Sequence, residues 1–362
     1  MSAILKSLET DYLALQLDSY QNLIISFQTK ACSGAPGLLA SLKNLFYQIN
    51  THPEIQQNLN LRGLIIWQPE PKFFCVGADL SFVVECIRQK KWTVLHGYIS
   101  MFQQVSMAIR HSVLPVVAAM SGYALGGGCE IALHCHYRVV TADLKMGLVE
   151  TGIGLVPAGA GTKEMIARSA KLGGSLAYLK SERPTLILEA VLDSKFKFSE
   201  NFTEQVRPFF ENIACAKMSN NAEEAKKLGY LMPEDQIVET HDVLLANAQE
   251  ILKQHGGLLS NNKGHIVSGF DFLEPVFMEV GTANIEAALI TAYRKMNPTA
   301  TEYDLTMASR VAHIFSGESA SKLMSEDQVL ANEIKYFMAS AQDPKTLERL
   351  EYVLKTGKHL HN

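Results

Sequence analysis

The stretch YALGGGCEIALHC (residues 123–135) sets three consecutive glycines, 126–128, in front of an apolar segment that contains one carboxylate, Glu130. Runs of glycine mark positions where the backbone adopts positive φ or approaches another group closely. A glutamate among apolar neighbours needs a partner or a shifted pKa. The apolar spacing predicts a helix over 126–135, so the stretch is either a turn before a helix or part of a site.

A glycine loop that opens a helix directs free backbone N–H groups and a partial positive charge at whatever lies in front of it. Two sites use this arrangement, a phosphate cradle and an oxyanion hole. The phosphate motifs require GxxxxGK[ST], or GxGxxG after a first strand with an acidic residue some 20 positions later. Neither pattern occurs around residues 126–128, which favours the oxyanion hole.

A second stretch, FFCVGADL (73–80), supplies the missing half of such a hole. Gly77 is expected in a turn, and Asp79 can cap the helix that follows. The N–H of Ala78 is then a free donor that can act together with the N–H of Gly127. Two donors fixed on one carbonyl oxygen favour negative charge there, each with an effect of about 10²–10³ on rate.

A third stretch, MGLVETGIGLVPAGAGTKEM (146–165), places Glu150 among apolar residues just before further glycines. One short predicted strand separates it from Glu130, which lets the two carboxylates face one small volume. Paired carboxylates whose surroundings separate their pKa values can share the acid and base steps of a reaction.

Together, in this order and spacing, the three stretches resemble the crotonase (enoyl-CoA hydratase/isomerase) family. The resemblance is strong over about 60–175 and looser over 214–231. It implies an α/β fold, a crotonase-like spiral of ββα units with a helical C-terminal region, divided into a catalytic domain over 1–245 and a helical region over 246–362. Residues 149–165 and 345–358 are similar to the crotonase-like C-terminal half of long bacterial 3-hydroxyacyl-CoA dehydrogenases.

The resemblance implies an enoyl-CoA hydratase that adds water to trans-2-enoyl-CoA in fatty-acid β-oxidation. The amides of Ala78 and Gly127 would hold the thioester oxygen, Glu130 would activate water, and Glu150 would exchange a proton at the α-carbon. Further substrate-binding residues carried over from the motifs are Val76, Gly77, Asp79, Leu80 and Gly126. No metal or separate cofactor is expected, because coenzyme A is part of the substrate. The alternatives are an isomerase or thioester hydrolase on the same oxyanion hole, and a weakly active acyl-CoA-binding subunit of a separate dehydrogenase.

Five positions depart from the family pattern or invite another interpretation. His136 stands where many members have Asp, and Val149 stands where many have Pro. His134 and His136 form a His-x-His pair, but two histidines at this spacing rarely face the same way on a helix, so we expect structural roles. Cys75 and Cys129 flank the site without a histidine placed to activate them, and are expected to be buried thiols.

Composition sets the remaining limits. The 362-residue chain is 47% hydrophobic and 19% charged with a net charge of −4, which is typical of a globular protein and gives no reason to expect nucleic acid. Six scattered cysteines indicate a cytoplasmic protein. The longest apolar region, 113–135, contains Pro115 and Glu130, so no membrane span is expected. Apolar stripes on the late helices favour a homo-oligomer, and the resemblance allows a dehydrogenase or thiolase partner.

The patterns of apolar residues predict alternating strands and helices up to about residue 180 and mainly helices from about 184 onward. The expected strands cover 12–18, 22–28, 62–68, 114–122 and 137–142, and the expected helices cover 37–49, 81–111, 126–135, 160–173, 220–231 and 343–358.

Overall fold

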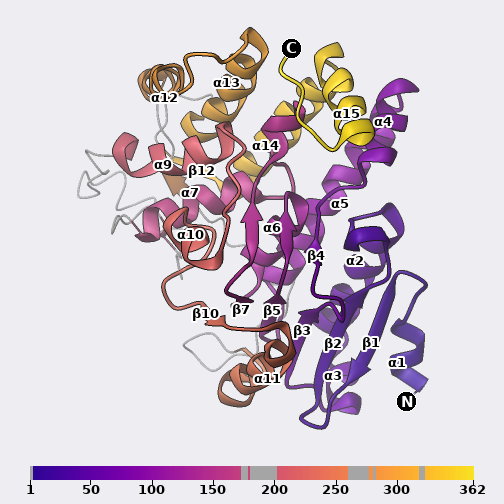
Figure 1. Ribbon diagram of the computed structural model, residues 1–362. Coiled ribbons are helices and arrows are strands. Elements are labelled where there is room, and N and C mark those ends of the chain that lie inside the picture. Colours follow the sequence, from indigo (N-terminus) through magenta and orange to yellow (C-terminus); the bar gives the residue numbers. More distant parts are fainter. Residues whose placement is uncertain (1–2, 173–177, 180–201, 260–276, 280–282, 318–322) are drawn as a thin grey trace. The chain divides into compact units, whose positions relative to one another are not determined.

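The computed structural model describes residues 3–172, 178–179, 202–259, 277–279, 283–317 and 323–362 (Figure 1). The chain forms two compact units that alternate along the sequence. The first contains Met1–Asp79, Ser100–Gly147 and Met218–Phe272, and the second contains Leu80–Ile99, Leu148–Lys217 and Leu273–Asn362. The division into 1–245 and 246–362 stays a prediction.

A six-stranded sheet forms the centre of the first unit. Its order is β1 (Leu13–Leu17), β2 (Asn22–Phe27), β3 (Gly63–Trp67), β5 (Val116–Met120), β7 (Tyr137–Thr141) and β10 (Gln236–Val238). Only the β1–β2 pair is antiparallel. Inner parallel strands are buried on both faces, which explains their continuous apolar runs, such as VVAAM in β5.

Helix α11 (Leu244–His255) covers one face of this sheet. Its residues Ala248 and Leu252 belong to the same buried cluster as Ile65, Val117 and Val139 of the strands. The remaining helices that lie wholly in the first unit are α1 (Ala3–Leu8), α2 (Pro36–Thr51), α3 (Pro53–Leu59), α6 (Gly127–His134) and α10 (Ala222–Lys227). The core therefore rests on residues whose apolar pattern is visible in the sequence.

A second, smaller sheet of the first unit was not expected from the sequence. Its three parallel strands are β4 (Phe73–Cys75), β6 (Tyr123–Leu125) and β8 (Lys145–Gly147), in that order. Each follows one strand of the large sheet, giving the successive pairs β3–β4, β5–β6 and β7–β8. Helices α4 (Leu80–Arg88) and α6 come after the first two pairs. This repetition is the spiral of ββα units that the resemblance implies.

The second unit is mainly helical, as expected for the later part of the chain. It contains the short 3₁₀ helix η2 (Glu150–Ile153), helix α7 (Gly161–Leu172) and a three-stranded sheet in the order β12 (Leu323–Ser325), β11 (Phe277–Glu279) and β9 (Tyr178–Leu179). Its later helices are α9 (Phe202–Ala214), α12 (Ala283–Met296), α13 (Glu302–Ser316), α14 (Glu326–Ala341) and α15 (Pro344–Thr356). Helix α5 (Trp92–Arg110) contributes to both units.

Local signals explain where several of these helices begin. Thr301 and Ser325 form capping boxes at the starts of α13 and α14. Asp343 accepts a hydrogen bond at the start of α15, where Pro344 occupies the first position. At α7 the cap comes from a distant helix, because the buried carboxylate of Glu333 accepts the N–H groups of Ala160 and Lys163 at 2.9 and 2.7 Å.

The expected elements are found with small differences in length. The region 81–111 forms two helices, α4 and α5, and the helix expected over 220–231 shortens to the six residues of α10. Gly229 follows α10 with a φ of 77°, a conformation that ends helices. Parts of the regions 176–212 and 246–340, which the resemblance does not explain, lie outside the described residues.

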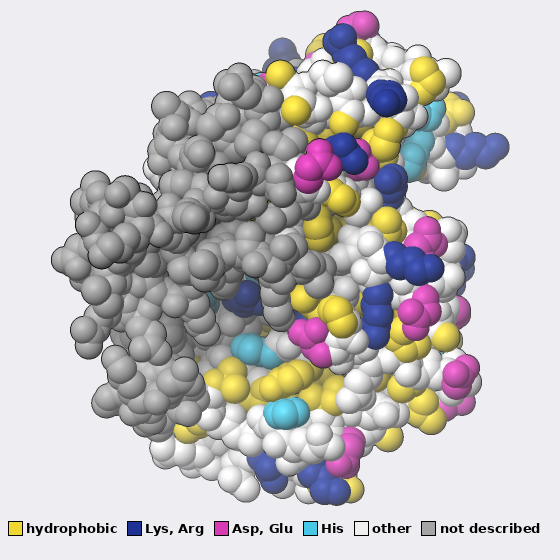
Figure 2. Space-filling view, turned by 90° about the vertical axis from the view of Figure 1, so that its left-hand side faces the viewer, with side chains coloured by type: hydrophobic (Ala, Val, Ile, Leu, Met, Phe, Trp, Pro, Cys, Tyr) yellow, Lys and Arg dark blue, Asp and Glu magenta, His cyan; other side chains and the backbone are white. Residues whose placement is uncertain are grey.

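The remaining observations concern the apolar character of the helices and the distribution of charge on one face. Among the described helices, none has the length and apolar character needed to cross a membrane. On the face shown in Figure 2, the basic side chains of the described residues are interspersed with acidic ones.

Candidate active site

The two glycine loops of the first unit meet where β4 and β6 end. Gly77 has a φ of 84°, and a Cβ built on it would lie 2.8 Å from both the nitrogen of Gly127 and the carbonyl oxygen of Leu125. Only glycine permits both this φ and this approach of the two backbones. The parallel pairing of β4 with β6 is what brings residues 50 positions apart in sequence to the same edge.

The N–H groups of Ala78 and Gly127 are available at this edge. Gly34 donates to the carbonyl oxygen of Gly77 at 2.7 Å and pairs with Ala78 in a parallel bridge. Gly127 is the first residue of α6, where the N–H groups have no partner within the helix. Within the described residues, no backbone carbonyl accepts the N–H of Ala78 or of Gly127. An oxyanion hole requires two such donors, and the assignment of Ala78 and Gly127 to that role stays a prediction.

Gly126 sets the direction of the second donor. It precedes α6 with a φ of 52° and a ψ of −126°, a conformation that favours glycine. Its N–H donates to the carbonyl oxygen of Gly147 at 2.9 Å, which joins the end of β6 to the end of β8. Gly128 meets Cys75 so closely that a Cβ built there would lie 2.1 Å from the Cys75 carbonyl oxygen. Glycine is therefore required at 126 by the backbone conformation and at 128 by the contact with Cys75.

Two residues that pack at the glycine loops, Gly34 and Phe102, were missed in the sequence. A Cβ built on Gly127 would lie 2.5 Å from the ring of Phe102, and one built on Gly34 would lie 2.4 Å from the same ring. Phe102 is buried on α5 and packs against both loops. Gly34 stands in the Gly- and Pro-containing segment SGAPG, which signals a loop, whereas nothing in the sequence distinguishes Phe102 from other core aromatics.

Glu130 lies on α6, one turn after Gly127, and is 3% exposed. Its backbone N–H donates to Gly126, and its carbonyl oxygen lies 2.7 Å from Nδ1 of the buried His134. Glu130 and the amides of Ala78 and Gly127 thus all lie in the first unit, and Glu130 and Gly127 lie on the same short helix. The role of Glu130 in a site stays a prediction.

A buried ion pair fixes the other end of α6. Arg138 donates to the carbonyl oxygens of Ala132 and Cys135 at 3.3 and 2.7 Å, and its Nε lies 2.7 Å from the carboxylate of Asp235. Both charged side chains are almost fully buried. A cation at the C-terminus of a helix stabilises the last carbonyl groups, so Arg138 holds the helix that carries Glu130. Neither residue is marked by a local signal in the sequence.

Glu150 opens η2 in the second unit, where Gly154 ends the turn with a φ of 79°. The hydroxyl of Thr151 donates to Ile213 of α9 at 2.6 Å, and the hydroxyl of Thr346 on α15 donates to Gly154 at 2.6 Å. The turn is therefore held from two helices. Its approach to Glu130 stays a prediction, since the two carboxylates belong to different units.

The predicted substrate-binding residues Val76, Asp79 and Leu80 lie beside the Gly77–Ala78 turn in sequence. Val76 and Asp79 flank the Gly77–Ala78 turn in the first unit, and Leu80 begins α4 in the second. His136, which replaces the family's usual Asp, accepts the N–H of Val116 on its Nδ1 at 3.1 Å. An accepting Nδ1 requires the tautomer protonated at Nε2, so this histidine binds the backbone of β5 as a neutral ring.

The two cysteines that flank the site are buried, as expected. Burial raises the pKa of the Cys75 thiol to about 12, so it stays protonated at neutral pH. A protonated thiol is a poor nucleophile. We assign Cys75 a packing role beside Gly128.

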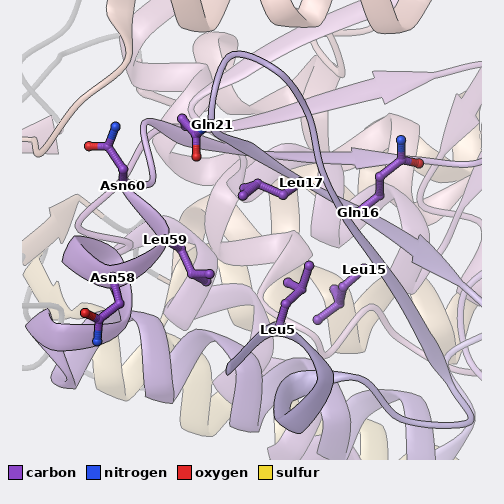
Figure 3. Close-up of a pocket in the computed structure, with 8 residues that line it drawn as sticks. All are labelled: Leu5, Leu15, Gln16, Leu17, Gln21, Asn58, Leu59 and Asn60. Atoms are coloured by element: carbon purple, nitrogen blue, oxygen red, sulfur yellow. The ribbon is translucent and has the colours of Figure 1, made fainter. Parts of the chain in front are cut away.

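A separate hollow of about 430 Å³ lies in the first unit between α1, β1 and α3. Figure 3 shows Leu5, Leu15, Leu17 and Leu59 directed into it. Amide side chains complete its lining, and none of the predicted site residues contributes to it. The oxyanion donors are therefore not part of this hollow.

Part of the chain is similar in sequence to known proteins. Residues 46–178 match the family model for enoyl-CoA hydratase/isomerase, a segment that contains all the predicted site residues. Over these residues the chain is similar to the enoyl-CoA hydratase/isomerase family. The chain is 28% identical over 311 residues to a probable 3-hydroxyacyl-CoA dehydrogenase of Bacillus subtilis (strain 168). This match covers 84% of this chain and 34% of that protein.

Other relatives are similar over shorter segments. The putative enoyl-CoA hydratase/isomerase YngF of Bacillus subtilis (strain 168) is 39% identical over 112 residues, covering 31% of this chain and 42% of YngF. The matched segments thus span well under half the length of these two relatives. The crystal structure of a putative enoyl-CoA hydratase from Streptomyces avermitilis superposes with a TM-score of 0.57 at 14% identity, covering 96% of this chain and 93% of that one. This likeness confirms the fold.

Proposed function

We propose that the chain is an enoyl-CoA hydratase that adds water to trans-2-enoyl-CoA thioesters, as in fatty-acid β-oxidation. The observation that carries the proposal is the meeting of the Gly77–Ala78 turn with the start of α6, which leaves two backbone donors at one edge. A thioester carbonyl bound there is polarised, and the negative charge of an enolate is stabilised where it develops.

In this mechanism Glu130 accepts a proton from water as the water oxygen adds to the β-carbon of the substrate. Glu150 delivers a proton to the α-carbon, which collapses the enolate and gives the 3-hydroxyacyl thioester. Glu130 shares α6 with the donor at Gly127, which fixes the base relative to the oxyanion. The paired carboxylates favour hydration over reactions that need a single acid–base group.

A second candidate is isomerisation of an enoyl-CoA double bond, which uses the same oxyanion hole and one carboxylate to move a proton. The matched family model includes both activities in its description, which supports this alternative. Thioester hydrolysis on the same oxyanion hole is a further alternative. Similarity to a probable 3-hydroxyacyl-CoA dehydrogenase supports the last one, a weakly active acyl-CoA-binding subunit of a dehydrogenase.

Three assays on the purified chain separate these activities. When the protein is added to crotonyl-CoA, loss of the enoyl-thioester absorbance reports hydration. When it is added to a 3-enoyl-CoA, formation of that absorbance reports isomerisation. Release of free thiol from an acyl-CoA reports hydrolysis. We expect hydration to be the fastest. Faster isomerisation or hydrolysis would assign the site to that reaction instead.

We further propose that the protein is cytoplasmic, assembles as a homo-oligomer and has a separate dehydrogenase or thiolase as a partner. All six cysteines are free thiols, which agrees with a reducing compartment. Light scattering at micromolar concentration tests the assembly, and a mass near the 40.0 kDa of one chain would contradict it.

A further inference from the structure

A third contact on the Glu150 turn comes from residues after the last helix. A Cβ built on Gly152 would lie 2.6 Å from Cε1 and 2.8 Å from Nδ1 of the His359 ring. Gly152 lies in the middle of η2, two positions after Glu150. The ring therefore lies directly against the backbone of the turn that carries the proposed acid.

The segment that bears His359 is anchored to α15. Nε of Arg349 donates to Oδ1 of Asn362 at 2.8 Å, and Nδ2 of Asn362 donates to the carboxylate of Glu348 at 2.8 Å. Arg349 is 1% exposed, and its guanidinium also contacts Asp304 of α13 at 2.8 Å. Charge-assisted hydrogen bonds of a buried arginine are strong, so the contact with Asn362 holds the end of this segment against α15.

We propose that this segment is a clamp on the Glu150 turn and that His359 is its positioning residue. The hydroxyl groups of Thr151 and Thr346 hold the two ends of η2. The His359 ring covers the middle, at Gly152. These contacts all lie within the second unit. The functional part of the inference rests on the proposed role of Glu150, because a small displacement of a reacting group lowers the rate of the chemical step more than substrate binding.

The first test compares kinetics of His359→Ala with those of the wild type. We expect kcat for crotonyl-CoA hydration to fall about tenfold while KM changes less than about twofold. His359→Phe, which keeps a ring of similar size, is expected to restore most of kcat. The control is Lys358→Ala, which removes an exposed neighbouring side chain and is expected to leave kcat unchanged. Equal kcat in His359→Ala and wild type would overturn the positioning role.

The second test does not depend on activity and separates failure of the clamp from failure of the proposed function. Hydrogen exchange of a peptide covering 150–154 is measured by mass spectrometry in wild type, His359→Ala and Asn362→Ala. Both variants should exchange faster in this peptide alone, because each removes one part of the clamp. Unchanged exchange in both would overturn the clamp even in an active enzyme. Faster exchange in a chain without hydratase activity would support the clamp and reject the proposed function.

Discussion

The backbone of Gly127 approaches Gly77 so closely that a methyl group added to Gly77 would lie 2.8 Å from the Gly127 nitrogen. This contact joins the turn after β4 to the start of α6, and so joins the two proposed oxyanion donors. A side chain at Gly77 must displace one backbone from the other, and it is also strained by the φ of 84°.

Gly77→Ala is therefore expected to lower kcat for hydration by about 10²-fold or more, because one donor no longer points at the thioester oxygen. The control is Gly97→Ala on α5, an exposed position where an added Cβ meets nothing within 4 Å. That variant should keep full activity and gain about 0.4–1 kcal/mol in free energy of unfolding, since alanine favours a helix. A fully active Gly77→Ala protein would contradict the proposal that the Gly77 turn directs a donor used in catalysis.

Gly127 and Phe102 should show coupled effects on stability. A Cβ at Gly127 would lie 2.5 Å from the Phe102 ring, so Gly127→Ala displaces that ring, and Phe102→Leu provides space for it. We expect the double variant to be more stable than the sum of the two single changes predicts, with a coupling energy of about 0.5–3 kcal/mol. Urea unfolding of the four proteins measures this energy, and simple additivity would contradict the contact.

The buried pair of Arg138 and Asp235 is expected to matter more for stability than an exposed pair. Arg138→Met leaves the Asp235 carboxylate and the carbonyl groups of Ala132 and Cys135 without their cation, at a cost of about 3–5 kcal/mol in free energy of unfolding. The comparison is Arg88→Met, which breaks the exposed pair of Arg88 with Glu351 and should cost about 1 kcal/mol or less. Similar losses in both variants would contradict the role of Arg138 as the anchor of α6.

His359 should make stability depend on pH in the mildly acidic range. Partial burial lowers the pKa of His359 below its ordinary 6.5, and the charges of His361 and Arg349 lower it further. Because the folded state disfavours the protonated ring, the contribution of His359 to stability is present above pH 6.5 and is lost as the pH falls through the lowered pKa.

The measurement compares unfolding of wild type and His359→Phe in urea at a series of pH values from neutral to mildly acidic. The wild type should lose more stability below its ordinary histidine pKa than the variant, which has no titrating ring at this position. Parallel curves for the two proteins would contradict the lowered pKa.

The large sheet and most helices could be predicted because their apolar patterns are long enough to read. Strand β5, with the run VVAAM, and helix α7 are examples. Strands β4, β6 and β8 could not, because three residues are too few for a period-two pattern and each follows another strand after a short turn. They are nevertheless the strands that bring the two glycine loops together.

For the candidate site, the sequence pointed to the amides of Ala78 and Gly127 and to Glu130, because consecutive glycines and a carboxylate in an apolar helix are unusual; their roles stay predictions. It could not identify Phe102, Arg138 or His359, whose roles depend on contacts with residues distant in sequence. An ordinary core aromatic, a strand arginine and a histidine near the last helix carry no local signal of such contacts.

The most direct test of the two-carboxylate mechanism measures hydration of crotonyl-CoA by wild type, Glu130→Gln and Glu150→Gln. Glutamine keeps the size of the side chain but cannot exchange a proton, so each variant should retain acyl-CoA binding and lose about 10²–10⁴-fold in kcat. Circular dichroism and acyl-CoA titration establish folding and binding. A folded variant with near wild-type kcat would remove that glutamate from the mechanism, and near wild-type kcat in both would contradict hydration by paired carboxylates.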